Sequence, residues 1–282
     1  MPASEAPGAR AVRFTPPPMT PVRQARGRVW LIGAGPGDPD LITVAGLKVL
    51  QAADVVIHDR LGAPALLGEC RPDALKINVG KRAGRHALPQ EEINMLLARH
   101  AMAGRLVVRL KGGDPFIFGR GGEEMMALRQ RGIQVDIVPG VTAASACAAA
   151  TGIPLTHRGL ASEVSMITAH HRKDAEGCNW KQLAAQRDRT LVFYMGLSQA
   201  ADIAHGLMRH GFAGDTPVAL ISNGATSRQA ALRCTLDCLP ASAQHEGLMS
   251  PCLIVVGKVV DLAHPHCVAQ AMPTYEVSQW VA

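Results

Sequence analysis

Two glycine-rich turns contain the residues of this chain best suited to hold a ligand. The first, GAGPGDP at 33–39, follows an apolar run at 29–32, and the second, KGGDP at 111–115, follows an apolar run at 106–110. Glycine has no Cβ atom, so the backbone itself can lie against a ligand at such turns. Because both turns end in Gly-Asp-Pro, we expect them to form one bipartite ligand site.

The pattern of these turns argues against a dinucleotide pyrophosphate as the ligand. A pyrophosphate cradle needs a G-x-G-x-x-G turn whose free N–H groups open a helix. The first turn lacks that spacing, and Pro36, Pro39 and Pro115 have no N–H to donate. A nicotinamide dehydrogenase stays open as an alternative, because Asp54 lies about twenty residues beyond Gly33, where a ribose-binding acid is expected.

Strand and helix patterns alternate around these turns and predict a first α/β domain with a largely parallel sheet. The expected strands are 29–32, 54–58, 75–79, 105–110 and 133–138, and the expected helices are 43–52, 90–102 and 122–131. Ligands in such sheets bind outside the carboxyl ends of the strands, where both glycine turns lie. We therefore expect a cleft at that edge, facing a second domain.

A second alternating half follows Pro139-Gly140 and an alanine-rich helix at 141–150. Its expected strands are 163–168, 190–195, 217–222, 229–235 and 252–257, and its expected helices are 179–186, 198–210 and 240–246. No helix separates 217–222 from 229–235, which predicts an antiparallel pair. The predicted division is a disordered Pro/Arg-rich tail (1–27), an N-terminal domain (28–139), a hinge (140–157), a C-terminal domain (158–262) and an extension (263–282).

Composition favours a cytoplasmic globular protein. The chain has 282 residues, 48% of them hydrophobic, and no apolar run approaches the roughly 20 residues of a membrane helix. The N-terminus lacks the apolar core of a secretion signal. The seven cysteines are irregularly spaced, which is typical of reduced thiols rather than of a disulfide framework.

Charge and residue content also argue against two classes of ligand. The net charge of +6 and the 4% of aromatic residues give little support to a nucleic-acid surface. Cys234-x-x-x-Cys238 and His264-Pro-His266-Cys267 have no second motif at zinc spacing, so we expect no metal. Small anionic ligands stay open.

Six motifs, in order and spacing, resemble the uroporphyrinogen-III C-methyltransferases of the tetrapyrrole methylase family over about 28–260. They are GAGPGDPDLIT at 33–43, HDRL at 58–61, VGKRAGRHALPQEEIN at 79–94, RLKGGDPFIFGRGGEE at 109–124, VPGVTAASA at 138–146 and GIPLTHR at 152–158. The resemblance implies two α/β domains with S-adenosylmethionine between them, a homodimer, and two methylations of uroporphyrinogen III to precorrin-2 through precorrin-1. S-adenosylhomocysteine is the implied by-product.

The resemblance also implies the site residues. Contacts to S-adenosylmethionine fall on Pro36, Gly112, Gly113, Asp114, Ile117, Thr142, Ala143, Met195, Gly224 and Ala225. Acid and base positions fall on Asp59 and Lys81, which follow neighbouring strands at their carboxyl ends.

The implied reaction calls for one base, because the methylated ring must lose a proton from a bridge methylene. Asp59 is the first candidate and Glu123 the second. Arg120 is placed in the same group, but a guanidinium is a poor base, so we expect it to orient the substrate. The substrate's carboxylates are expected to meet Arg60, Arg82, Arg85, Arg120 and Arg158, with Glu123 and Met195 beside them; Arg109, inside a strand, could serve structure instead.

Three departures from the family pattern concern the substrate side of the site. His58 stands where tyrosine is usual, Gly159-Leu160 replaces Asp-Tyr, and Ala169 replaces glycine. The pathway served is left open between siroheme, cobalamin and another modified haem. With no dehydrogenase or ferrochelatase segment among these motifs, we expect the reaction to stop at the dimethylated product. Two further alternatives are a methylase for RNA or a later corrin, and a non-catalytic binder of anionic tetrapyrroles.

Overall fold

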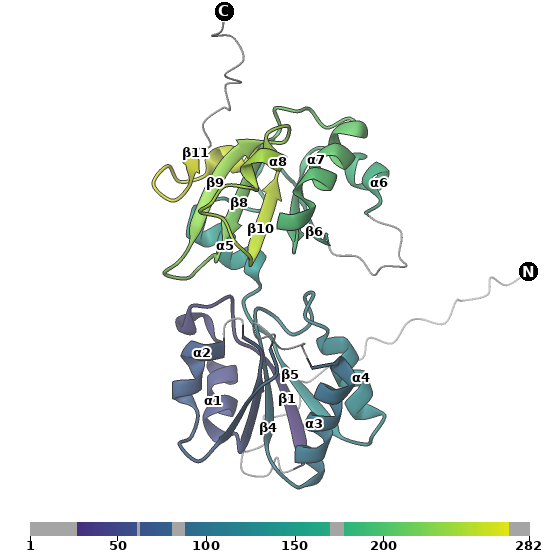
Figure 1. The fold of residues 1–282 in the computed structure, drawn as a ribbon, viewed down its shortest axis with the longest axis vertical. Helices are drawn as coiled ribbons and strands as arrows, with labels where there is room; N and C mark the ends of the chain where they lie inside the picture. Colours follow the sequence, from purple (N-terminus) through teal and green to yellow (C-terminus); the bar gives the residue numbers. More distant parts are fainter. Residues whose placement is uncertain (1–26, 61–62, 81–87, 170–177, 271–282) are drawn as a thin grey trace, which may run out of the picture.

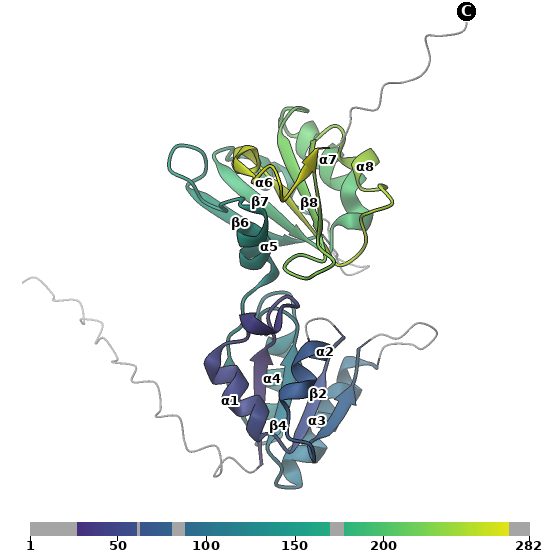
Figure 2. The same cartoon turned by 90° about the vertical axis from the view of Figure 1, so that its left-hand side faces the viewer.

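The chain folds around two β-sheets that lie end to end (Figures 1 and 2). The computed structural model describes residues 27–60, 63–80, 88–169 and 178–270. Strands β1 to β5 form the first sheet, and β6 to β11 form the second. Of the predicted N-terminal tail only Gly27 falls within the described residues, so its disorder stays a prediction.

The first sheet is parallel throughout, as the alternating pattern predicts. Across the sheet its strands are β3 (Leu75–Asn78), β2 (Val55–His58), β4 (Val107–Lys111), β1 (Arg28–Gly33) and β5 (Gln134–Val138). In register, Ile32 of β1 lies opposite Leu110 of β4 and Val138 of β5. The carboxyl ends of these three central strands therefore meet at one edge of the sheet.

Helices cover both faces of the first sheet. They are α1 (Val44–Ala52), α2 (Ala63–Leu66), α3 (Gln90–Met102) and α4 (Gly121–Arg129). Alternate strand residues point to opposite faces, so Leu31 packs with Leu97 of α3 and Leu128 of α4, while Ile32 packs with Leu50 of α1 on the other side. Two buried cores thus fix the sheet between helix layers.

Helix α3 shows why the sequence folds locally as predicted. Its bounds agree with the expected 90–102, with Glu91 and Glu92 in the first turn and Arg99 in the last, and these charges complement the helix dipole. Gly104 follows with a positive φ of 73°, a conformation that favours glycine and ends the helix.

The second sheet is mixed. Across it the strands are β11 (Ala269–Gln270), β9 (Ala230–Thr235), β8 (Pro217–Ser222), β10 (Cys252–Val256), β7 (Arg189–Tyr194) and β6 (Glu163–Thr168). The predicted antiparallel pairing of β8 with β9 is confirmed. Since β10 runs antiparallel to both β7 and β8, those two strands run in the same direction and end at the same edge.

Helices again lie on both faces of this sheet. The helices are α5 (Ala143–Thr151), α6 (Trp180–Ala184), α7 (Ala200–Arg209) and α8 (Leu239–Ser242). Ile203 and Leu207 of α7 pack on one face with Phe193, whereas Ala144 and Cys147 of α5 pack on the other. Four short 3-10 turns complete the described elements: η2 (Pro39–Leu41), η3 (Leu67–Glu69), η4 (Leu197–Gln199) and η5 (Lys258–Leu262).

The connection between the two sheets runs from Val138 to α5. Helix α5, inside the predicted hinge at 140–157, packs on the second sheet. Part of the predicted extension, β11, adds to that sheet through parallel pairing with β9. The domain boundaries themselves stay a proposal. No helix in the described part of the chain is long and apolar enough to span a membrane.

We predict that Leu97→Ala lowers the free energy of unfolding by about 2–5 kcal/mol, because it removes a fully buried side chain from α3. Met95→Ala on the same helix is the matched control: Met95 is 53% exposed, so its truncation should change stability by less than about 0.5 kcal/mol. Urea denaturation followed by circular dichroism measures both. Equal losses would contradict the assignment of this helix face to the core.

Candidate functional site

The two glycine-rich turns are hydrogen-bonded to each other. Gly113 N donates to Gly35 O at 2.7 Å, and Gly35 N donates to Gly113 O at 3.3 Å, which makes an isolated antiparallel bridge. Ala34 N also donates to Lys111 O at 2.7 Å. The two turns therefore form one continuous backbone surface at the ends of β1 and β4. That this surface is a bipartite ligand site stays a prediction.

A third backbone segment, at the end of β5, packs directly on this bridge. A Cβ atom on Gly140 would lie 2.3 Å from Gly113 O and 2.7 Å from Gly33 Cα. A Cβ atom on Gly33 would meet Gly140 Cα at 2.5 Å. Both positions therefore require glycine, because no side-chain carbon fits there.

Asp114 ties these segments together. Its Oδ2 accepts a hydrogen bond from Gly140 N at 3.0 Å, and its Oδ1 accepts one from Phe116 N at 2.8 Å. Both carboxylate oxygens thus already hold backbone N–H groups. Asp114 shapes the turn, and any ligand hydroxyl it binds would use the remaining lone pairs.

Loops from both halves of the chain contribute residues in strained conformations. Within the described ranges, every non-glycine residue with positive φ lies in a loop that carries or borders the predicted contacts: Phe118, Arg120, Met195, Asn223 and Ala225. Such conformations cost roughly 1–3 kcal/mol each and cluster at functional sites. Because β7 and β8 end at the same edge, Met195 and the Asn223–Ala225 turn lie at one end of the second sheet.

Tyr194, at the end of β7, connects this edge to the first half. Ala144 N donates to its hydroxyl at 3.0 Å, the Thr142 hydroxyl lies 2.7 Å away, and the ring centroid lies 4.9 Å from that of Phe118. Burial raises the pKa of the Tyr194 hydroxyl, so the phenol stays protonated at neutral pH. Sequence analysis missed Tyr194, although it precedes the predicted Met195.

The turn after β8 contacts both α5 and the first glycine turn. A Cβ atom on Gly224 would lie 2.2 Å from Cys147 Sγ, and a Cβ atom on Gly37 would lie 2.5 Å from Thr226 Cγ2. Burial raises the pKa of Cys147 to about 12, so this thiol is protonated and acts as packing. The predicted Pro36 region and the predicted Gly224 and Ala225 therefore meet across the two halves.

Asp59, the predicted base, follows β2 and is held by a buried arginine. Arg109 Nη2 donates to Asp59 Oδ1 at 2.6 Å, and the Arg109 side chain is 3% exposed against 32% for Asp59. Arg109 Nε also donates to Glu124 Oε1 at 3.2 Å, and Lys111 Nζ to the same oxygen at 3.1 Å. Burial, and secondly the Arg109 cation, lower the pKa of the Lys111 ammonium.

Arg120 and Glu123 pair with each other at the start of α4. Arg120 Nη2 donates to Glu123 Oε2 at 2.7 Å, and both side chains are about half exposed. This hydrogen bond raises the pKa of the Arg120 guanidinium, which stays charged. Arg120 is therefore suited to bind an anion and unsuited to accept a proton.

The structure describes two of the other predicted cations. Arg60 and Arg158 are exposed, Arg60 just after Asp59 and Arg158 in the turn between His157 and Ala161. A Cβ atom on Gly80 would lie 2.7 Å from Arg60 N, so the ends of β2 and β3 approach closely. Lys81, Arg82 and Arg85 lie outside the described residues.

Sequence comparison identifies the family. The profile of the tetrapyrrole (corrin/porphyrin) methylases matches residues 28–240. The chain belongs to the tetrapyrrole methylase family. A siroheme synthase of Edwardsiella ictaluri is 54% identical over 237 residues, which are 84% of this chain and 50% of that protein. The chain thus spans about half the length of the curated relatives it matches.

Solved structures of tetrapyrrole methylases share this fold. A uroporphyrin-III C-methyltransferase from Thermus thermophilus, complexed with S-adenosyl homocysteine, has a TM-score of 0.72 and 37% identity, covering 83% of this chain and 99% of that one. A cobalt precorrin-4 methyltransferase has a TM-score of 0.76 and 30% identity, covering 86% and 99%. The predicted fold of two α/β halves is confirmed, and the cleft between them stays a prediction.

The structure shows the surroundings of two of the three sequence departures. Gly159 adopts a φ of 86° in the His157–Ala161 turn, a conformation that glycine reaches without strain. His58 is 5% exposed, and its Nδ1 lies 2.9 Å from Asp59 O. His58 thus touches the backbone of the predicted base. Nothing in the structure explains Ala169 as a replacement for glycine.

The geometry around Asp54 argues against the nicotinamide alternative. Asp54 precedes β2 and lies at the opposite end of the strand from Asp59. Its Oδ2 accepts a hydrogen bond from Leu106 N at 2.8 Å, and its Oδ1 pairs with Arg71 at 3.2 Å. A ribose-binding acid of a dinucleotide site would have to lie at the carboxyl edge, so Asp54 has a structural role here.

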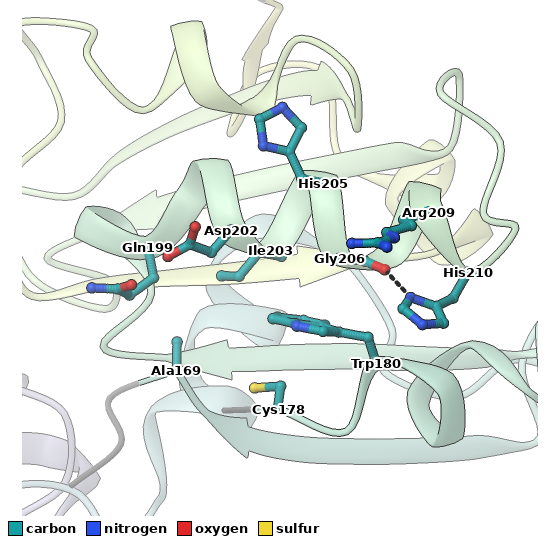
Figure 3. A pocket seen from close by; sticks show the side chains of 10 residues that line it. All are labelled: Ala169, Cys178, Trp180, Gln199, Asp202, Ile203, His205, Gly206, Arg209 and His210. Atoms are coloured by element: carbon teal, nitrogen blue, oxygen red, sulfur yellow. Dashed lines mark hydrogen bonds between the residues drawn. The ribbon is translucent and has the colours of Figure 1, made fainter. Parts of the chain in front are cut away.

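A separate pocket of about 350 Å³ lies between α6 and α7 (Figure 3). Trp180 forms one wall, and Asp202, Ile203 and Arg209 of α7 form the other. Its walls contain none of the predicted site residues. Across the described residues, no group of three or more His, Cys, Asp and Glu side chains could hold a metal ion.

We predict that Gly140→Ala lowers the free energy of unfolding by about 1–3 kcal/mol or more, because its methyl group would overlap Gly113 O and Gly33 Cα. Gly68→Ala is the control, since a Cβ atom there meets no atom within 4 Å. Chemical denaturation measures the two variants. Equal stability would show that the three backbone segments separate without cost, and would remove the basis of the bipartite site.

Proposed function

We propose that this chain is an S-adenosylmethionine-dependent C-methyltransferase that converts uroporphyrinogen III to precorrin-2 through precorrin-1. The observation that carries the proposal is the convergence of both glycine turns, the Gly140 segment and the strained loops after β7 and β8. Membership in the methylase family and the likeness to a uroporphyrin-III C-methyltransferase support it.

The residues at this junction fit S-adenosylmethionine. The bridged turns present backbone without side chains at Gly112 and Gly113, and no phosphate-binding series of amides is needed for this ligand. Ile117 is 36% exposed and Met195 51% exposed, which offers apolar surface for an adenine ring. Thr142 and Ala143 at the start of α5, with Gly224 and Ala225 opposite, would complete the contacts.

When bound, S-adenosylmethionine supplies an electrophilic methyl group whose leaving group is a neutral thioether. The chain's own task is therefore to align the substrate carbon, exclude water and remove one proton. Asp59 is our proposed base because its carboxylate is partly exposed at the carboxyl end of β2. Lys81, Arg82 and Arg85 follow the neighbouring strand β3 in sequence and keep their implied roles.

Exposed arginines would bind the carboxylates of the substrate. Arg60 and Arg158 carry the fork of donors that suits a carboxylate, and Arg120, paired with Glu123, would exchange or share its partner. Arg109 leaves this group, because its guanidinium is buried and bonded to Asp59 and Glu124. Metabolically, the relatives named siroheme synthases favour siroheme as the pathway.

A corrin intermediate is the second candidate substrate, since the cobalt precorrin-4 methyltransferase has a similarly high TM-score. We further infer a cytoplasmic homodimer. Seven free cysteines, four of them buried, are compatible with a reducing compartment. Light scattering after size-exclusion chromatography tests the dimer.

We expect incubation with uroporphyrinogen III and methyl-labelled S-adenosylmethionine to incorporate two methyl groups per macrocycle. Mass spectrometry of the oxidised product counts them. Incorporation into a later corrin but not into uroporphyrinogen III would transfer the proposal to the second candidate. Donor binding without transfer to either substrate would reject both.

We predict that Arg120→Ala and Arg158→Ala lower methylation by about tenfold or more, because each removes a cation that positions the substrate. S-adenosylhomocysteine binding should stay measurable by calorimetry. Arg209→Ala, on the wall of the α6–α7 pocket, is the matched control and should leave both quantities unchanged. Loss of donor binding in Arg209→Ala would instead place the donor in that pocket.

A further inference from the structure

The described part of the chain contains a buried cluster of charges that the proposed reaction does not use directly. Arg109 and Lys111 project from β4 toward α3 and α4, and Glu124 projects from α4 toward them; their side chains are 3%, 4% and 0% exposed. Glu124 Oε1 accepts hydrogen bonds from Arg109, Lys111 and Gln90, the last at 3.0 Å. Glu124 Oε2 is buried without a hydrogen-bond partner.

Such a cluster is expensive to bury. Removing charges from water costs several kcal/mol per ion, and well-packed apolar residues in their place are often as stable or more stable. A buried oxygen without a partner adds to that cost. Stability alone therefore does not explain this arrangement, and the contacts of the cluster indicate what else it does.

The geometry of Arg109 points to Asp59. All three guanidinium nitrogens of Arg109 are occupied: Nε by Glu124, Nη1 by the carbonyl oxygens of Ile57 and Leu110, and Nη2 by Asp59. The backbone carbonyls fix the plane of the guanidinium, and Glu124 fixes its rotation. The direction of Nη2, and with it the position of Asp59 Oδ1, follows from these contacts.

We propose that Arg109 and Glu124 are positioning residues that fix the Asp59 carboxylate at the carboxyl end of β2 for proton removal from the substrate. This inference rests on the proposed function. Asp59 has one oxygen on Arg109, and among the described residues Oδ2 accepts no hydrogen bond. One oxygen is thus anchored while the other is left for the proton.

Glu124 also balances the charge of the cluster. Without it, Arg109 would keep one partly exposed carboxylate, that of Asp59, and among the described residues Lys111 would have no carboxylate within ion-pair distance. Glu124 binds both cations through a single oxygen and keeps Lys111 on the α4 side. Lys111 itself passes beneath the loop that carries Phe118 and Arg120: a Cβ atom on Gly119 would lie 3.4 Å from Lys111 Cε.

The test compares Glu124→Gln with Asp59→Asn and with the double variant, using uroporphyrinogen III protonated or deuterated at its bridge methylenes. We expect Asp59→Asn to lower kcat about 100-fold or more, as the loss of a base does. Glu124→Gln should lower kcat about 10- to 100-fold, with S-adenosylhomocysteine affinity unchanged. The double variant should be no slower than Asp59→Asn, because both act on one step.

The deuterated substrate distinguishes a displaced base from a nonspecific loss of activity. If Asp59 is displaced, proton removal becomes slower than methyl transfer, and Glu124→Gln should show a larger deuterium isotope effect on kcat than the unaltered enzyme. Glu69→Gln is the matched control: it removes the same charge from an exposed position in the first half and should leave kcat and the isotope effect unchanged.

A charge-balanced variant keeps the test valid if Glu124→Gln does not fold. Arg109→Met/Glu124→Gln removes one buried charge of each sign, so it should stay folded while releasing Asp59. We expect reduced kcat and the same enlarged isotope effect. Wild-type kcat in this variant, while Asp59→Asn is impaired, would overturn the inference, and so would an unimpaired Asp59→Asn variant of an active enzyme. An inactive unaltered enzyme would instead reject the proposed function.

Discussion

The close approach of three backbone segments at Gly33, Gly113 and Gly140 is the constraint on which the site depends. The segments follow β1, β4 and β5, which are neighbours in the sheet and end in register, so their carboxyl ends converge. Any side chain at Gly33 or Gly140 would force them apart. The register of these apolar strands thus brings three loops within contact distance. There the Asp114 carboxylate accepts a hydrogen bond from Gly140 N and links two of them.

Strand β4 contributes both backbone and a charged side chain to the proposed site. On its β1 side it ends in the glycine bridge that we assign to the methyl donor, and on its β2 side it carries Arg109, which holds Asp59. The sheet order β3-β2-β4-β1-β5 therefore places the strand that carries the proposed base next to the strand that carries half of the proposed donor surface. The cation that anchors the base is itself buried, with its side chain 3% exposed.

The sequence predicts more of the fold than of the site. Apolar runs and end signals place every β-strand longer than two residues to within two residues. The strands β2, β4 and β10 are buried at every position, which gives near-continuous apolar runs in the sequence. The two-residue β11 and the four-residue α2 carry no such pattern. Sequence analysis missed Glu124. Gly121, Glu124 and Leu128 recur at helical spacing on one buried face of α4, and this spacing distinguishes Glu124 from its neighbour Glu123. The bonds of Tyr194 depend on tertiary contacts that no local pattern encodes.

Both halves of the chain are needed to build the junction, and the strained residues explain why. Phe118 and Arg120 come from the first half, whereas Met195, Asn223 and Ala225 come from the second. Such conformations persist only where surrounding contacts hold the loop. Tyr194 is hydrogen-bonded to the start of α5 and contacts Phe118 with its ring tilted by 54°. Gln229 accepts a hydrogen bond from Ala225 N at 2.8 Å. The four buried cores supply the stability that lets these few loops depart from relaxed geometry, so the strain is concentrated where a ligand would contact it.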